Sequence, residues 1–158
     1  MINEGKGGRP TAAVADFVAM LKRQPRADVL VIALGTNDSR DISDQCVPKA
    51  IRNLESMVLK AREFYGDNLA ILLVAPPNIR KDALGPTRPI ADQREARLQE
   101  LGYAYKTLAE KLKCDFVSLY GVVPKSTLAR DGVHPSGPGN QPIAEAVLAK
   151  LLSIQTKK

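Results

Sequence analysis

Two short, almost uninterrupted apolar runs constrain the fold of this chain more than any other feature. ADVLVIALG at 27–35 and LAILLVAPP at 69–77 are the kind of segment found in strands that are covered on both faces. A shorter and more mixed run, CDFVSLYG at 114–121, predicts a third strand. Strands of this kind belong to parallel sheets, which need helices on both faces.

Helical periodicity precedes each of these strands and follows the last. Apolar residues recur at three- and four-residue spacing around 14–21, 47–65, 98–112 and 143–151. Asp92 and Ser136 are candidate start signals for the last two helices. Alternating helices and strands imply right-handed crossovers between parallel strands. We therefore expect an α/β protein, a three-layer α/β/α sandwich that residues 1–158 form as a single domain.

Composition argues against several classes of partner. Lys and Arg give a net charge of +6 but are dispersed along the chain, with no basic block interleaved with aromatic residues, so we expect no nucleic-acid partner. Nothing approaches the apolar run of about 18 residues that a membrane span requires. MINEGKGGRP also lacks the apolar stretch of a secretory signal. A cytoplasmic protein is expected, unless an upstream signal peptide has been lost.

The cysteines do not indicate a metal site or a disulfide framework. Cys46 and Cys114 lie far apart and fit no metal-ligand spacing, and the chain has one histidine. We interpret both as buried or partly buried thiols in a reducing compartment. No metal and no cofactor is expected.

Polar residues gather where the predicted strands end. GTND at 35–38 follows the first buried strand, and DGVHPS at 131–136 follows the last, so both should reach the carboxyl edge of the sheet. His134, the sole histidine, lies three residues after Asp131, whose carboxylate can orient the imidazole as a general base. The Asn37 amide is suited to donate to a developing oxyanion. Taken singly, an inert Asp-Gly turn and an Asx turn remain alternatives.

A glycine-rich loop, NEGKGGRPT at 3–11, precedes the first predicted helix. Its backbone amides could bind a phosphate or an oxyanion, and a flexible loop is the alternative. It lacks the Gly-Lys-Ser/Thr ending of a P-loop and the G-x-G-x-x-G of a dinucleotide site. A nucleotide-binding flavodoxin-like domain, which the order of elements alone would allow, is therefore disfavoured.

In this order the three stretches resemble the SGNH hydrolase superfamily, also called the GDSL esterases and lipases. NEGKGGRPT is similar to its second block, with Gly8 as the oxyanion glycine, and GTND to its third, with Asn37 as the oxyanion asparagine. DGVHPS is similar to the fifth block, where Asp131 and His134 would complete a Ser-His-Asp triad. The resemblance covers about residues 2–152. It implies a flavodoxin-like SGNH fold and hydrolysis of small acyl, aryl or carbohydrate esters.

One block of that family has no counterpart here. The family's nucleophile follows its first strand in a Gly-Asp-Ser block, and GDS occurs nowhere in this sequence, so the nucleophile is absent from the chain. The resemblance places the missing first strand centrally in the sheet, and we therefore expect an N-terminally incomplete version of a longer protein. The alternative is a catalytically inactive binding or assembly module, a homo-oligomer joined through its open sheet.

Three further expectations concern residues around this site. Ser39, two residues after Asn37, is the least implausible substitute nucleophile, because it lies on the same edge. Asp38 is interpreted as a residue that organises its loop. The proline-rich stretch 76–93 is longer than a typical connection and is expected to form a lid or substrate wall. Its polar character favours small or sugar esters over long acyl chains.

Overall fold

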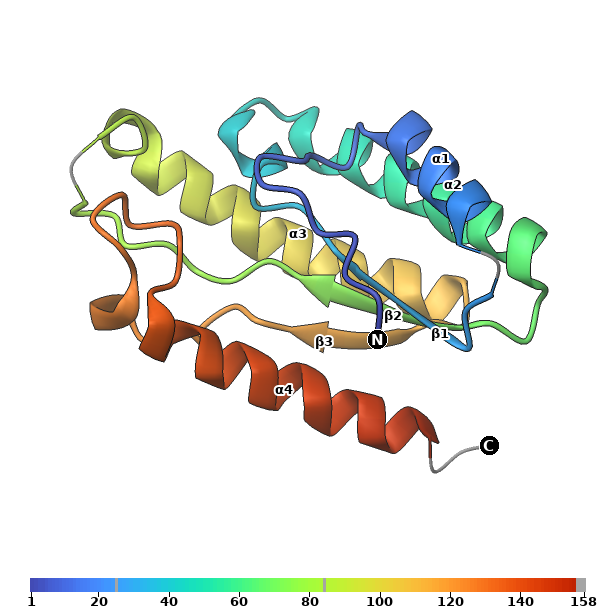
Figure 1. Ribbon diagram of the computed structural model, residues 1–158. Helices are drawn as coiled ribbons and strands as arrows, with labels where there is room; N and C mark the ends of the chain where they lie inside the picture. Colours follow the sequence, from blue (N-terminus) through green and yellow to red (C-terminus); the bar gives the residue numbers. More distant parts are fainter. Residues whose placement is uncertain (25, 84, 156–158) are drawn as a thin grey trace.

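The computed structural model describes residues 1–24, 26–83 and 85–155. Helices α1, α2 and α3 lie on one side of a central sheet and α4 lies on the other, which makes three layers (Figure 1). The order is α1 (Val14–Arg23), β1 (Val29–Ala33), α2 (Cys46–Tyr65), β2 (Ala70–Ala75), α3 (Ala91–Lys111), β3 (Asp115–Ser118) and α4 (Gly137–Gln155). The predicted sandwich and its sequence of elements are confirmed.

The described sheet has three parallel strands in the order β1-β2-β3. Val29 of β1 is in register with Ala70 of β2, and Leu72 of β2 with Asp115 of β3. The central strand β2 is buried along nearly its whole length. The outer edge of β1 pairs with no strand among the described residues.

Two apolar clusters fill the space between the layers. The larger lies between the sheet and α1, α2 and α3, and the smaller lies between the sheet and α4. Ile71 and Leu73 enter the larger cluster, while Leu72 and Val74 enter the smaller one. Because successive side chains of a strand point to opposite faces, a strand with a cluster on each face must be apolar throughout.

Both predicted helix start signals lie where their helices begin, Asp92 in the first turn of α3 and Ser136 directly before α4, but their side chains bond elsewhere. A short 3₁₀ turn, η2 (Arg88–Ile90), runs directly into α3, and the Asp92 carboxylate in its first turn instead pairs with Lys81 Nζ at 2.8 Å. Ser136 directly precedes α4, but its hydroxyl donates to the Thr127 carbonyl oxygen at 2.6 Å. Both side chains are held by residues distant in the sequence, which a local pattern does not reveal.

The cysteines are as predicted in burial. Cys46 is buried and Cys114 is partly exposed, and both thiols are free. Burial raises the pKa of the Cys46 thiol to about 11. Lys157 and Lys158, the last of the dispersed basic residues, lie outside the described residues.

Candidate functional site

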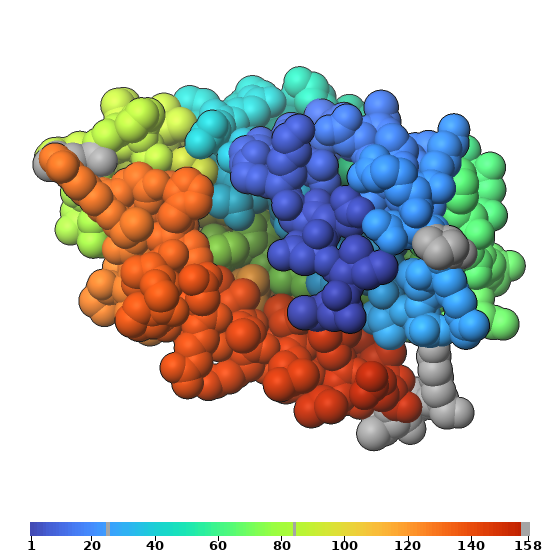
Figure 2. Space-filling view, viewed as in Figure 1, coloured from blue at the N-terminus to red at the C-terminus, as the bar shows by residue number. Residues whose placement is uncertain are grey.

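The three polar stretches lie at the carboxyl ends of the strands. The turn after β1 carries Asn37, the segment before α1 carries Gly8, and the loop before α4 carries Asp131 and His134. Figure 2 shows a recess between the orange atoms of this last loop and the blue atoms of the N-terminal segment, with green atoms at its floor. The loop that carries the candidate base and the N-terminal segment that carries Gly8 border this recess, and no hydrogen bond joins His134 to Gly8 or Asn37 within the described ranges.

Asp131 holds the imidazole of His134 from one side. Its Oδ2 lies 2.5 Å from His134 Nδ1, and its Oδ1 accepts the backbone N–H groups of Val133 at 2.9 Å and of His134 at 3.1 Å. Burial alone would raise the pKa of Asp131, but these hydrogen bonds and the imidazole lower it to about 2. The carboxylate is thus ionised at neutral pH, and it directs Nε2 of the imidazole away from itself. The His134 side chain is 72% exposed, and Nε2 has no hydrogen-bond partner among the described residues.

The loop that carries this pair is a tight hairpin anchored on the segment after β2. Within the loop, Ala129 N–H donates to the His134 carbonyl oxygen at 2.7 Å. Between the loop and the segment after β2, the Arg80 N–H donates to the Gly132 carbonyl oxygen at 2.8 Å. Gly132 has a φ of +70°, and a Cβ there would lie 2.4 Å from the Ala83 Cβ and 2.5 Å from the Arg80 carbonyl oxygen. Only glycine fits this turn, for reasons of both conformation and space.

The glycine loop and the turn after β1 are joined through Asp38. Its carboxylate accepts the Thr11 N–H at 3.0 Å and the Thr11 hydroxyl at 2.5 Å, and Asn53 Nδ2 donates to the same hydroxyl at 3.2 Å. Thr11 is completely buried. Asp38 therefore organises its loop, as predicted, and also fixes the position of the glycine loop relative to Asn37.

The two predicted oxyanion donors have N–H groups with weak or no internal partners. Asn37 Nδ2 donates to the Arg9 carbonyl oxygen at the long distance of 3.5 Å. Gly8 has a φ of +76°, is exposed, and its N–H donates to no acceptor among the described residues. Both groups are available to an incoming anionic oxygen.

Arg94 of α3 is a site-supporting residue that the sequence reasoning missed. It is 2% exposed, and its three hydrogen-bond partners are uncharged. Its Nε donates to Ser39 Oγ at 2.9 Å. One terminal nitrogen donates to the Thr36 carbonyl oxygen at 3.0 Å, and the other donates to Thr87 Oγ1 at 2.9 Å. Burial, followed by the charge of Arg40, lowers the pKa of this guanidinium. Arg94 thereby connects the turn that carries Asn37 with the 76–90 segment. The sequence pattern of this amphipathic helix does not indicate that its arginine is buried against the turn after β1.

We expect Arg94→Met to lower the free energy of unfolding by about 2–4 kcal/mol, because three acceptors that now receive charge-assisted bonds lose them while staying buried. For a chain of this size the melting temperature should fall by roughly 5–15 °C. Arg88→Met, at an exposed position of η2, is the matched control and should change it by about 1 °C at most. A thermal melt followed by circular dichroism measures both, and equal shifts would contradict the assignment.

The structure excludes Ser39 as a nucleophile. Its side chain is completely buried, and its hydroxyl donates to the Thr36 carbonyl oxygen at 2.7 Å while accepting from Arg94. Within the described ranges, no serine hydroxyl is hydrogen-bonded to His134. The sequence argument placed Ser39 on the correct edge, but a residue on an edge can still point into the core.

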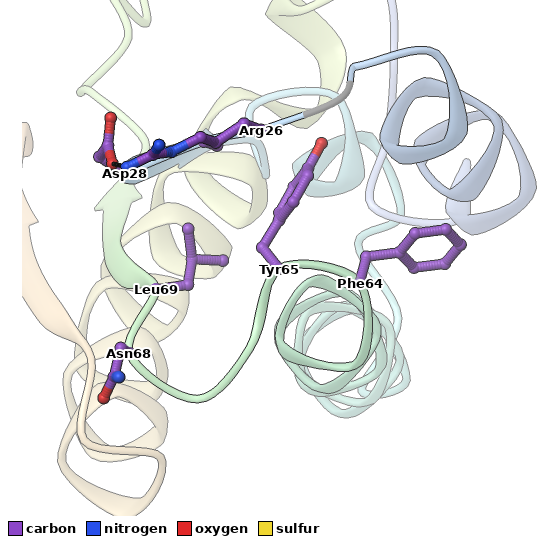
Figure 3. A pocket seen from close by; sticks show the side chains of 7 residues that line it. Arg26, Asp28, Phe64, Tyr65, Asn68 and Leu69 are labelled. Carbon is purple, nitrogen blue, oxygen red and sulfur yellow. Dashed lines mark hydrogen bonds and ion pairs between the residues drawn. The ribbon is translucent and has the colours of Figure 1, made fainter.

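A cavity of about 440 Å³ adjoins Asn37, one of the two oxyanion candidates. It lies between the segment before α1 and the start of α2, and its polar lining includes Asn37, Asp41, Lys49, Arg52 and Asn53. A second cavity, of about 340 Å³, lies at the opposite, amino ends of β1 and β2 (Figure 3). There Phe64 and Tyr65 project from the end of α2, and Arg26 pairs with Asp28 at 3.1 Å. None of the candidate site residues lines this second cavity.

The 76–93 segment, apart from residue 84, which lies outside the described residues, contacts the loops that follow β3. Buried Asn78 bridges to the loop after β3, since its Nδ2 donates to the Val123 carbonyl oxygen and its Oδ1 accepts the Gly121 N–H, both at 3.0 Å.

The described residues contain no cluster of three metal-ligating side chains. None of the described helices is long and apolar enough to cross a membrane.

The fold and the motifs match known proteins. The model of the GDSL-like lipase/acylhydrolase family matches residues 1–141. No curated protein matches the chain. Among solved structures, a carbohydrate acetylesterase from Sinorhizobium meliloti is 22% identical, with a TM-score of 0.77, over 97% of this chain and 78% of its own. The native aryl esterase of M. smegmatis is 21% identical, with a TM-score of 0.80, over 96% and 77%.

An acetyl xylan esterase variant from Geobacillus stearothermophilus is 22% identical, with a TM-score of 0.73, over 94% of this chain and 71% of its own. At these identities the structures establish a shared fold, and roughly a quarter of each solved chain has no equivalent here. The match of the family model over residues 1–141 goes further, and the chain belongs to the GDSL-like lipase/acylhydrolase family.

Proposed function

We propose that these residues form the base and oxyanion part of a serine esterase that hydrolyses small acyl, aryl or carbohydrate esters. The observation that carries the proposal is the Asp131–His134 pair, in which an ionised carboxylate holds Nδ1 at 2.5 Å and leaves Nε2 exposed. A side chain held in this way is the base of a Ser-His-Asp triad. In this proposal the serine is supplied by a segment outside these residues, since no described serine hydroxyl is hydrogen-bonded to the imidazole.

In the proposed reaction, His134 Nε2 removes the proton of the serine hydroxyl as the serine oxygen attacks the ester carbonyl carbon. Gly8 N–H and Asn37 Nδ2 donate to the oxygen that becomes negatively charged. The protonated imidazole, stabilised by Asp131, then gives its proton to the leaving alcohol, and an acyl-serine remains. Water activated by the same nitrogen hydrolyses this intermediate and restores the serine.

The cavity beside Asn37 supports a small, polar substrate. Its lining carries the amide of Asn53 and the cationic side chains of Lys49 and Arg52, which suit hydroxyl-rich alcohols better than a long hydrocarbon chain. The similar solved structures are an acetyl xylan esterase, a carbohydrate acetylesterase and an aryl esterase. Acetyl esters of sugars and of simple phenols are therefore the substrates to test first.

The test is to supply the serine covalently. An apolar six-residue strand followed by Gly-Asp-Ser is fused ahead of residue 1 through a flexible linker of about 30 residues, whose r.m.s. span is about 30 Å. We expect hydrolysis of p-nitrophenyl acetate and labelling of the added serine by a fluorophosphonate. A fusion with alanine in place of that serine is the control and should do neither. A folded serine fusion that is neither active nor labelled would reject the proposal and favour an inactive binding module.

A further inference from the structure

We propose that Arg94 is a positioning residue whose buried charge, which no carboxylate neutralises, favours a negatively charged oxygen at the Asn37 amide. Its hydrogen bonds tie the turn after β1 to the 76–90 segment, and the charge gives it a further role in the chemistry of the site. The part of this inference that concerns ester hydrolysis rests on the proposed function.

The charge of Arg94 is buried without a counter-ion. The acceptors of its three hydrogen bonds are two hydroxyl oxygens and one carbonyl oxygen, and it forms no ion pair with a carboxylate among the described residues. Burying a cation without an opposite charge is costly. A neutral glutamine could donate to two of the same acceptors at a smaller cost. The hydrogen bonds alone therefore do not account for a cation at this position.

The guanidinium is held against both ends of the short segment that contains Asn37. It donates to the Thr36 carbonyl oxygen and to Ser39 Oγ, and the Ser39 hydroxyl donates to that same carbonyl oxygen at 2.7 Å. Thr36 and Ser39 are the residues on either side of Asn37 and Asp38. The positive charge is thus fixed next to the turn that presents the candidate oxyanion donor.

Arg94 is also electrostatically connected to the other half of the site. Burial lowers the pKa of its guanidinium, the charge of Arg40 lowers this pKa further, and the carboxylate of Asp131 acts in the opposite direction. The exposed Arg40 adds to the positive charge on this side of the turn. The field of Arg94 therefore reaches the carboxylate that holds the imidazole as well as the turn of the oxyanion donor.

The charges of the proposed transition state explain the use of a cation. As His134 takes the serine proton, the imidazolium neutralises the carboxylate of Asp131, and a new negative charge forms on the ester oxygen at Asn37. Arg94 is the charge that balances this oxygen. A charge that is already in place in a low-dielectric site stabilises the oxygen without rearrangement. Because this stabilisation exists only once the oxygen is charged, it raises kcat and leaves KM unchanged.

Thr87→Asp separates the charge of Arg94 from its hydrogen bonds. Thr87 is buried, and its hydroxyl accepts from a terminal nitrogen of Arg94 at 2.9 Å. An aspartate can accept the same bond while it neutralises the guanidinium, so the contact is kept and the field is lost. Thr87→Asn, of the same size and uncharged, is the matched control. Circular dichroism checks that both variants fold.

The first measurement uses the 158-residue chain and methylphosphonate, a tetrahedral anion that resembles the charged intermediate. We expect saturable shifts of the Asn37 side-chain amide signals in nitrogen-15 NMR spectra. At constant ionic strength, Thr87→Asp should weaken binding by about fivefold or more, and Thr87→Asn should stay within about twofold of the parent. Arg94→Lys should bind more tightly than Arg94→Gln, because only the lysine keeps the charge.

The second measurement uses the serine fusion and p-nitrophenyl acetate, with fluorophosphonate titration to count the active molecules. Thr87→Asp should lower kcat per active serine by about tenfold or more and change KM by no more than about twofold. Thr87→Asn should stay within about threefold of the parent in kcat. A role in folding alone would leave kcat per active serine unchanged in both variants.

The outcomes separate the role of Arg94 from the proposed function. Equal methylphosphonate affinity in the parent and Thr87→Asp, or no shift at Asn37 at about 50 mM methylphosphonate, overturns this role. If Thr87→Asp does not fold, equal affinity in Arg94→Lys and Arg94→Gln overturns it instead. Weaker binding in Thr87→Asp together with an inert serine fusion retains the role of the charge and rejects the esterase. An active fusion in which Thr87→Asp leaves kcat unchanged does the reverse.

Discussion

His134→Ala in the serine-fused chain is expected to lower kcat for p-nitrophenyl acetate by about 10⁴-fold or more. Without the imidazole, the serine hydroxyl stays protonated and the leaving alcohol receives no proton, and losses of this order follow removal of a triad base. The ring is 72% exposed and contacts mainly Asp131, so the fold should not change. The measurement is steady-state hydrolysis, with circular dichroism as the check on folding.

Asp131→Asn is the informative companion. An amide at this position keeps the size of the side chain but cannot fix the tautomer with Nδ1 protonated, so a drop of about 10⁴-fold in kcat is expected. Asp92→Asn removes a carboxylate from an exposed ion pair with Lys81, and it should leave the rate unchanged. Undiminished turnover in His134→Ala would remove this residue from the mechanism altogether.

Gly132→Ala is expected to lower the free energy of unfolding by about 2–5 kcal/mol. The left-handed backbone contributes about 1–2 kcal/mol for a residue with a Cβ. Overlap with Ala83 and the Arg80 carbonyl oxygen contributes about 1–3 kcal/mol more. The melting temperature should fall by roughly 5–15 °C, and activity of the fused chain should fall further than stability alone explains, because the turn separates Asp131 from His134.

Gly121→Ala separates the cost of the left-handed backbone from the cost of steric overlap. Gly121 also has a positive φ, of +80°, but a Cβ there meets no atom within 4 Å. It should show only the conformational cost of about 1–2 kcal/mol, and activity of the fused chain should be retained. Equal losses in the two variants would mean that packing against the 80–83 segment does not hold the loop of Asp131 and His134.

The sequence was sufficient to predict the helices and strands, because each has a local pattern of apolar residues. Strand residues that alternate between two buried clusters must be apolar throughout, so β1 and β2 were visible as continuous runs. The helices followed from their spacing, and the strand exits correctly placed Asn37 and His134 at one edge. Asp131 was within local reach of His134, and the hydrogen bond between them forms as expected.

Contacts between distant segments could not be predicted. The sequence gives no reason to pair Arg94 with Ser39 and Thr87, or Asp38 with Thr11, since these depend on how the layers pack. The same limit explains why the side chains of Asp92 and Ser136 bond outside their helices and why Ser39 points inward. An Asp-Gly turn was visible at residues 131–132, but the collision that makes glycine obligatory at Gly132 involves residues about 50 positions earlier in the chain.

The anchoring of the loop that carries Asp131 and His134 has a consequence for how its surroundings could diversify. Its hydrogen bond to the segment after β2 joins main-chain atoms, from Arg80 N–H to the Gly132 carbonyl oxygen, and its internal bond from Ala129 to His134 does too. Main-chain bonds survive replacement of the side chains that flank them. Exposed positions such as Lys81 and Asp82 can therefore be exchanged while the backbone that carries Asp131 and His134 keeps its place, which makes this segment a region open to laboratory evolution.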